Sequence, residues 1–499
     1  MTVSVRGKAD PAQALDAAIR ALRANGADLP IEDVDRALDV APNDARLWHV
    51  KGLIHRQQER RELAIPALRR AVELAPREPL IAHGYARTLY EAGLPSVPEH
   101  AHAMKLARDN PDIVKSLVGA LIAERRVADA IDGMQLALSR SPLWSEGQAL
   151  LSQLRWLEGE REGFTRNFDE ALATNPGALD LRRQQIIALV HAEQWDEVLD
   201  RIARGRAAIG DQLLFDVNEA IVHSELGHAH IADAKFEALA HVPDPAMQVR
   251  RVRHLLWTGR VDRAVETIDQ WLPRPEGFMF WPYASIAWRL TDPARWEWLE
   301  GHESFVGVYD IGDRLPPLDQ LTATLRNLHT LSGQPLEQSL RGGTQTDGNI
   351  FTHIDPVLVQ LREAIRDTVA EHVAKFPAPD PSHPLLGVAR SPIGFQGAWS
   401  VRLHTKGYHA NHVHPAGWIS SALYIVLPPD LGQEDAGFLT LGEARSEGFK
   451  IDLPPFRTVE PKPGRLVLFP SYMWHGTRPF SEGERMTVAF DVARGPAAA

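Results

Sequence analysis

Prolines recur at a nearly constant interval along the first part of this chain. Neighbouring members of the series are 34, 35, 31 and 34 residues apart, at Pro42, Pro76, Pro111, Pro142 and Pro176. Several of them follow an Ala- or Leu-rich helical turn, and proline cannot continue a helix because it lacks the amide donor and clashes with the preceding turn. A fixed period of this length predicts a stack of helical hairpins in which each repeat packs against its neighbours.

The second repeat shows the pattern most clearly. Trp48 and Gly52 fall in its first predicted helix, Ala64–Ala67 open the second helix, and Ala71–Pro76 end it. In this pattern the region resembles the tetratricopeptide repeat, a helix–turn–helix unit that stacks into a superhelix. Such arrays usually present a concave surface to a partner. We therefore expect a repeat array at 1–300 that binds a protein or peptide, with packed helices that bind no ligand as the alternative.

Length, charge and cysteine content limit the remaining choices. At 499 residues the chain is too long for one ordinary core, so two or more domains are expected. The net charge of −11 argues against a general nucleic-acid or membrane-surface partner. The absence of cysteine excludes disulfides, zinc–thiolate sites and thiol catalysis. Without a long apolar run, the sequence predicts a cytoplasmic protein, and it leaves the oligomeric state open.

The sequence pattern changes after residue 300. Pro316-Pro317 indicates a connecting segment at 301–345, and Asp355-Pro356 predicts the start of a helix that continues to about Phe376. Short β-rich segments separated by Gly and Pro then follow at Trp399–Leu403, Ser420–Leu427, Gly437–Leu441, Arg465–Phe469 and Met486–Val492. This spacing of strands after a helix predicts a small barrel or jelly roll within a domain at 346–499.

Three histidines in the strand-rich region have the spacing of a metal site. His412 and His414 are separated by one residue, so a strand would point both to the same side. His475 follows a later strand and can complete a facial set of three imidazoles, which leaves coordination positions open as non-haem Fe(II) oxygenases require. Arg485 comes ten residues after His475 and offers a cationic fork for a carboxylate. The pattern predicts a metal centre beside a dicarboxylate site.

Sequence motifs around these histidines carry a family resemblance. Asn411–Pro415 reads NHxHP, Ser420–Tyr424 reads SxxxY, and Gly464–His475 reads GxLxLFPSxxxH. With these motifs, residues from about 315 to 494 resemble the 2-oxoglutarate- and Fe(II)-dependent oxygenases, closest to a bacterial branch, and Ser339–Thr346 resembles a signature of members linked to tetratricopeptide repeats. The resemblance implies an all-α tetratricopeptide superhelix followed by an α+β domain with a double-stranded β-helix (jelly-roll) core.

The resemblance also implies an activity and roles for individual residues. It predicts a dioxygenase that uses Fe(II), 2-oxoglutarate and O2 to hydroxylate a protein or peptide side chain. By position, His412 and His475 match iron ligands, and Arg485 matches the residue that binds the distal carboxylate of 2-oxoglutarate. Thr487 would add a hydroxyl donor to that carboxylate, and Tyr424 lies on a strand that often reaches the co-substrate.

His414 departs from the family pattern, because most of the superfamily has Asp or Glu at this position. Either His414 coordinates the metal in a three-His site, or it stands aside and a water takes its place. Strand alternation favours coordination, since it aims His414 at the same point as His412. The nearby His404 and His409 are expected to be polar residues at the rim.

Two further alternatives remain open from the sequence. A three-His dioxygenase of the cupin type would have a glutamate a few residues after the His-x-His pair, and Ala416–Ser421 contains none. A non-catalytic repeat scaffold with a vestigial metal-binding barrel is the other alternative. The retention of Arg485 together with all three histidines argues against it, because a decaying site has no need to keep a co-substrate anchor.

Overall fold

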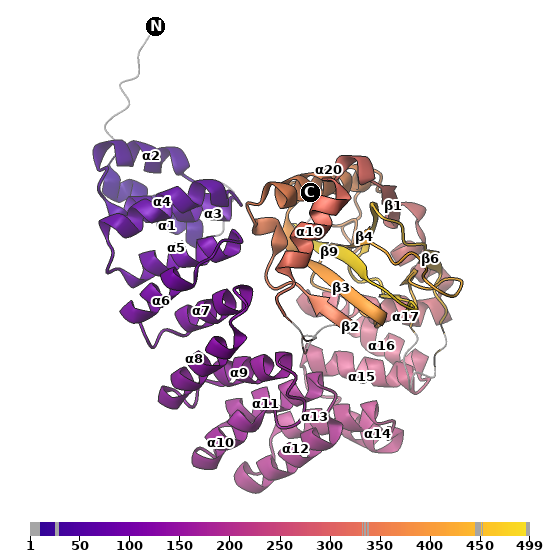
Figure 1. Cartoon of the computed structure of the whole chain (residues 1–499). Coiled ribbons are helices and arrows are strands. Elements are labelled where there is room, and N and C mark those ends of the chain that lie inside the picture. Colours follow the sequence, from indigo (N-terminus) through magenta and orange to yellow (C-terminus); the bar gives the residue numbers. More distant parts are fainter. Residues whose placement is uncertain are drawn as a thin grey trace. The chain divides into compact units, whose positions relative to one another are not determined.

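The computed structural model describes residues 10–24, 29–331, 333, 336, 339–444, 451 and 453–495, and these form two compact units (Figure 1). Unit 1 comprises Met1–Ala137 with Asp347–Val359, and unit 2 comprises Leu138–Thr346 with Gln360–Ala499. Unit 1 is helical. Unit 2 contains further helical hairpins and all of the described strands.

Antiparallel helical hairpins build unit 1. Its helices are α1 (Pro11–Arg23), α2 (Ile31–Val40), α3 (Ala45–Gln57), α4 (Arg61–Leu74), α5 (Pro79–Glu91), α6 (Val97–Leu106), α7 (Pro111–Ala123) and the first part of α8 (Val127–Arg140). Asp44 caps the start of α3, because its carboxylate accepts a hydrogen bond of 2.9 Å from the amide of Arg46. A Cβ atom at Gly52 would collide with Leu68, so the lack of a side chain there lets α3 and α4 pack closely.

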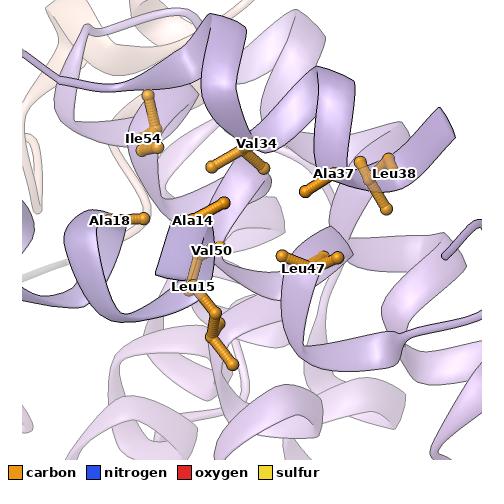
Figure 2. Packing of buried hydrophobic residues seen from close by; sticks show 9 residues of the cluster. All are labelled: Ala14, Leu15, Ala18, Val34, Ala37, Leu38, Leu47, Val50 and Ile54. Carbon is orange, nitrogen blue, oxygen red and sulfur yellow. The ribbon is translucent and has the colours of Figure 1, made fainter. Parts of the chain in front are cut away.

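The first hairpins share a closely packed apolar core. Figure 2 shows nine buried side chains from α1, α2 and α3 that turn toward one another, namely Ala14, Leu15, Ala18, Val34, Ala37, Leu38, Leu47, Val50 and Ile54. They recur at helical spacing, such as Ala14 with Ala18 and Val34 with Leu38, which places each set on one face of its helix. The repeat therefore gains its stability from packing between hairpins.

The periodic prolines mark the turns between hairpins, with one difference. Pro42, Pro76, Pro142 and Pro176 each follow the second helix of a hairpin, as expected of a residue that cannot continue a helix. Pro111 instead occupies the first position of α7. Proline is favoured there because the first amide of a helix has no intrahelical acceptor.

A segment distant in sequence, Asp347–Val359, also belongs to unit 1. The hydroxyl of Thr352 donates to the carbonyl oxygen of Glu91 at 2.6 Å, and the amide of Ile354 donates to that of Ala92 at 3.2 Å. The hydroxyl of Tyr90 donates to the carboxylate of Asp347 at 2.7 Å. These contacts hold the segment that leads into α20 against the end of α5.

Unit 2 continues the hairpins. Its helices include α9 (Ser145–Leu157), α10 (Arg166–Thr174), α11 (Leu179–His191), α12 (Trp195–Ile209), α13 (Leu213–Glu225), α14 (Ala229–Ala238), α15 (Pro245–Trp257), α16 (Val261–Trp271), η1 (Pro275–Met279), α17 (Trp281–Thr291), α18 (Pro293–Trp296) and the π-helix η2 (Glu297–Gly301). After these come η3 (Glu303–Phe305), η4 (Gly312–Arg314), α19 (Leu318–Leu328), η5 (Ile350–Thr352, in unit 1) and α20 (Pro356–Val373). None of the helices in the described part of the chain has the length and apolar character needed to cross a membrane.

Two antiparallel sheets form the rest of unit 2. The strands are β1 (Gly307–Asp310), β2 (Leu340–Gln345), β3 (Phe395–His409), β4 (Ile419–Val426), β5 (Leu439–Leu441), β6 (Arg457–Val459), β7 (Arg465–Pro470), β8 (His475–Thr477) and β9 (Arg485–Val492). The main sheet has the order β1-β7-β4-β9-β3-β2, and the minor sheet has the order β6-β5-β8. The helical hairpins followed by a two-sheet β domain confirm the predicted fold class.

The sequence predicted the long strands well and the short ones poorly. Each of the five predicted strands overlaps an observed one, and the predicted helix corresponds to α20. The strands β1, β2, β6 and β8 were missed. The predicted connecting segment 301–345 in fact contains β1, α19 and β2, and both strands are hydrogen-bonded into the main sheet. The proposed domain boundaries themselves stay predictions.

The two faces of β9 have different chemistry, and this difference positions the site. Side chains alternate along a strand, so Met486, Val488, Phe490 and Val492 share one face, and all four are fully buried. The opposite face carries Arg485, Thr487 and Asp491, which are polar and yet 2%, 7% and 8% exposed. Buried polar groups need partners, so this face is a candidate for a binding site inside the two-sheet domain.

Candidate metal centre

His412 and His475 are brought together by the backbone. They form an isolated antiparallel bridge in which the amide of His412 donates to the carbonyl of His475 at 2.9 Å, and the amide of His475 donates in return at 3.0 Å. Their ring centroids are 4.1 Å apart. The chain between them is 62 residues long, and the short strand β8 brings its two ends together.

His414 completes the cluster. Its amide donates to the carbonyl oxygen of Ser471 at 2.8 Å, which fixes its backbone next to the turn before β8. One ligand atom each from His412, His414 and His475 lies within 4.8 Å of the other two. The structure therefore brings together all three histidines that the sequence selected as metal ligands, and a single ion could bridge atoms at this separation.

The backbone holds the Nδ1 edge of the imidazoles of His412 and His475, and Nε2 of His412 lies 3.2 Å from the hydroxyl of Ser339. Nδ1 of His412 lies 2.8 Å from the carbonyl oxygen of Ala410, and Nδ1 of His475 lies 3.0 Å from that of Met473. A carbonyl oxygen can only accept, so each of these Nδ1 atoms carries the proton and each Nε2 keeps its lone pair. This is the tautomer that a metal-binding imidazole needs.

Burial favours the neutral form of two of the three imidazoles, His412 and His475. It lowers the pKa of His412 to about 3, with the neighbouring His414 adding to the effect. Burial also lowers the pKa of His475 well below its usual 6.5, again with nearby imidazoles contributing. Both rings are therefore neutral near pH 7, and neutral imidazole is the form that coordinates a metal ion.

The second half of the site is a buried cation. Arg485 lies on β9 opposite Leu403 of β3, and its side chain is buried with Nε and Nη1 lacking any hydrogen-bond partner among the described residues. Burial lowers the pKa of this guanidinium from its usual value, although arginine keeps its charge in proteins. An exposed ion pair with Glu484 is not what the structure shows, because Glu484 binds Arg326 and Arg402 instead.

Tyr424 and Thr487 lie beside this cation. They face each other in the register of β4 and β9, and the guanidinium carbon of Arg485 lies 5.2 Å from the centre of the Tyr424 ring. The Tyr424 hydroxyl is buried and has no hydrogen-bond partner in the described part of the chain. Burial raises the pKa of Tyr424, so the hydroxyl keeps its proton and is available as a donor.

Four residues near the cluster were not selected from the sequence. Asp491 accepts a hydrogen bond from Nδ1 of His414 at 2.7 Å, and Trp399 stacks against the same imidazole. Ser339 Oγ lies 3.2 Å from Nε2 of His412. The ring of His409 lies 6.0 Å from that of His412 and is half-buried. Asp491 could have been selected from the sequence, because strand alternation places it on the same face of β9 as Arg485 and Thr487. The other three depend on long-range folding.

Residues 397–491 match the model of the family described as "Putative 2OG-Fe(II) oxygenase". This segment is similar to that oxygenase family. It includes the histidine cluster, Arg485, Tyr424 and Thr487, all on strands β3 to β9 or the loops between them. The match confirms the resemblance of the C-terminal region to these oxygenases that was drawn from the motifs.

Solved structures resemble parts of the chain. A Pseudomonas putida prolyl-4-hydroxylase is 17% identical with a TM-score of 0.26, and covers 38% of this chain and 94% of its own. Yeast Tom70 is 13% identical with a TM-score of 0.35, and covers 59% of this chain and 68% of its own. The tetratricopeptide protein YrrB is 16% identical with a TM-score of 0.25, and covers 36% of this chain and 95% of its own. Similarities at these TM-scores carry no functional argument, and no curated protein matches the sequence.

Proposed function

We propose that this chain is an Fe(II)- and 2-oxoglutarate-dependent dioxygenase that hydroxylates a protein or peptide side chain recruited by its repeat helices. The observation that carries the proposal is the combination of three clustered imidazoles with a buried arginine whose Nε and Nη1 have no hydrogen-bond partner among the described residues. The family match over residues 397–491 supports the oxygenase class.

The histidine cluster fits the metal that this family implies. Its donors are imidazole nitrogen atoms from His412, His414 and His475, and imidazole is a suitable ligand for iron. Three protein ligands leave coordination positions for a chelating co-substrate and for O2. Bound there, Fe(II) would supply O2 activation and the oxidation of a substrate C–H bond.

The buried cation fits a dicarboxylate. An isolated charge in a low-dielectric interior is costly unless an opposite charge and hydrogen bonds compensate it. Arg485 Nε and Nη1 have no acceptor among the described residues, so a carboxylate group bound at one edge of the guanidinium would supply an acceptor that this cation lacks. The hydroxyl groups of Tyr424 and Thr487 are positioned to donate to the same anion. These residues would orient 2-oxoglutarate and exclude water from its far end.

The repeats supply a reason to expect a macromolecular substrate. Helical hairpins of this type form extended surfaces on which a peptide or protein can bind. Capture on the repeats would raise the effective concentration of a target side chain at the metal. In this proposal the hairpins bind the substrate, and the β domain carries out the chemistry.

Anaerobic metal binding tests the proposal. Wild-type chain should bind one Fe(II), and adding 2-oxoglutarate should produce a weak visible charge-transfer band. His412→Ala and His475→Ala should each lose tight Fe(II) binding, because each removes one donor from a set of three. Full Fe(II) occupancy in either variant would show that the ligands are assigned wrongly. If the wild type binds iron without the band, the alternative of a non-catalytic scaffold is favoured.

The substrate class is tested with the full-length His475→Ala variant. Proteins captured on this variant should gain one oxygen atom when they are incubated with wild-type chain, Fe(II) and 2-oxoglutarate, as read by mass spectrometry. The same incubation without 2-oxoglutarate is the control. Oxidation that does not depend on 2-oxoglutarate would contradict the proposal.

A further inference from the structure

The three imidazoles of the cluster differ in what holds their Nδ1 atoms. His412 and His475 are held by neutral backbone carbonyls of Ala410 and Met473. His414 alone is held by a carboxylate, because its Nδ1 lies 2.7 Å from Oδ2 of Asp491. His414 also occupies the sequence position at which a carboxylate ligand is usual in this class of iron site. His414, the imidazole at the position of the usual carboxylate ligand, is therefore the one that hydrogen-bonds to a carboxylate.

Asp491 is itself fixed and buried. Its side chain is 12% exposed, and its other oxygen accepts a hydrogen bond of 2.6 Å from the hydroxyl of Ser420. The Ser420 hydroxyl also lies 2.9 Å from that of Ser471, whose backbone carbonyl accepts from the amide of His414. The stacked ring of Trp399, 5.8 Å away and 6° from parallel, restrains the imidazole from the side. These contacts define the orientation of the carboxylate and of the ring together.

The negative charge of Asp491 has no permanent counter-charge. Among the described residues its partners are the Ser420 hydroxyl and the His414 ring, and no lysine or arginine forms an ion pair with it. A buried carboxylate is unfavourable unless a cation lies nearby. Arg485 lies six residues away on the same strand, at the other end of the polar face. A divalent ion on Nε2 of His414 would provide the missing positive charge through the imidazole.

We propose that Asp491 is the positioning residue that restores to this three-histidine centre the anionic character of the absent carboxylate ligand. The carboxylate accepts the Nδ1 proton of His414, sets the tautomer so that Nε2 faces the metal, and makes the imidazole a stronger donor. In this arrangement the anionic group would not coordinate the metal directly. It hydrogen-bonds instead to Nδ1 of His414, on the side of the ring that faces away from the metal. This inference rests on the proposed metal centre and extends it by one residue.

Co(II) binding to the full-length chain tests the inference without any need for turnover. Asp491→Asn keeps the size of the side chain and removes its charge. The contacts are kept as well, because the side-chain amide oxygen can still accept from Nδ1 of His414 and the amide nitrogen can donate to the Ser420 hydroxyl. We expect this variant to bind Co(II) roughly 10- to 100-fold more weakly, with a shift in the visible absorption bands of the bound ion. Asp310→Asn is the matched control. It removes a carboxylate of the same domain that binds Arg465 and Lys462 on the surface, and it should leave both readings unchanged.

A second variant separates charge from orientation. Asp491→Ala removes both, so it should weaken Co(II) binding at least as much as Asp491→Asn. Wild-type affinity and bands in Asp491→Asn would overturn the proposal, and loss in Asp491→Ala alone would show that only ring orientation matters. His412→Ala identifies a failure at the earlier step. If wild type and His412→Ala bind Co(II) equally, the assignment of the metal ligands is wrong, and the role proposed for Asp491 is wrong for the same reason.

Discussion

At the scale of single residues, Arg485 offers the most direct test of co-substrate binding. Arg485→Ala should leave Co(II) and Fe(II) affinity nearly unchanged, because the guanidinium is not part of the ligand cluster. It should weaken 2-oxoglutarate binding by about 30- to 1000-fold, since loss of one partner of a buried charged pair costs roughly 2–4 kcal/mol. Calorimetry on the metal-loaded chain measures both. Arg465→Ala is the control, because Arg465 pairs with Asp310 at the surface of a neighbouring strand. Equal 2-oxoglutarate affinity in wild type and Arg485→Ala would show that the arginine does not bind the co-substrate and has a structural role alone.

A second residue-scale prediction concerns Glu300, a buried carboxyl in η2. Ser285 donates to it at 2.6 Å, its Oε1 has no partner among the described residues, and burial raises its pKa from 4.5 to about 7. Between these two pH values the folded chain holds a proton that the unfolded chain has released, so stability falls as pH rises through this window. Glu300→Gln removes the titration. It should match wild type near pH 4.5 and exceed its free energy of unfolding by about 3 kcal/mol near pH 8.

Denaturant unfolding of both proteins across this pH range measures the difference, and comparison at each pH cancels the contributions of other groups. A difference in free energy of unfolding between the two proteins that does not change with pH would contradict the raised pKa of Glu300.

At the scale of elements, the loop that carries His475 is fastened to the last helices before the β domain. The indole of Trp474 donates to the carbonyl of Pro282 at 2.8 Å, and the hydroxyl of Tyr472 donates to that of Leu299 at 2.8 Å. Within unit 2, α17 and η2 therefore help to position His475, a candidate metal ligand, and Figure 1 shows α17 beside the strands. Trp474→Phe removes the indole donor, so Co(II) affinity should fall by about fivefold, equivalent to about 1 kcal/mol.

The matched control for this element is Trp48→Phe. The Trp48 indole also donates to a proline carbonyl at 2.8 Å, but it does so in unit 1. This variant should lose a similar amount of stability and keep wild-type Co(II) affinity. An equal effect of both substitutions on Co(II) binding would show that Trp474 acts through general stability rather than through the loop.

At the scale of the whole molecule, the two compact units should respond differently to metal. The whole candidate centre lies in unit 2, so an ion that binds only the folded state stabilises that unit by mass action, by about 2.7 kcal/mol at a concentration one hundred times the Kd. Calorimetry should therefore show a Co(II)-dependent rise in the Tm of one transition, and a chelator should reverse it. The other transition should stay in place, and His412→Ala should show no rise. A single transition that moves as a whole would show that the two units unfold together.

The sequence determined the elements and the candidate ligands, because these depend on short-range patterns. The proline period gives the helical hairpins, and alternation along a strand places Arg485 and Thr487 on one face. The His-x-His spacing points His412 and His414 to the same side. Each of these follows from the geometry of a single element. The short strands β6 and β8 escaped prediction because three residues carry little pattern, and the equally short β5 was predicted only as part of the longer segment Gly437–Leu441.

Only the tertiary structure decided which groups meet. The bridge between His412 and His475 and the contact of Asp491 with His414 join residues more than sixty positions apart, and no local pattern specifies such pairs. The structure also decided that Arg485 is buried with Nε and Nη1 lacking a hydrogen-bond partner in the described part of the chain, which a sequence with glutamates beside it could not reveal. The physical reason is that burial and electrostatic pairing are properties of the packed sheets, in which distant strands exclude water from the same small volume.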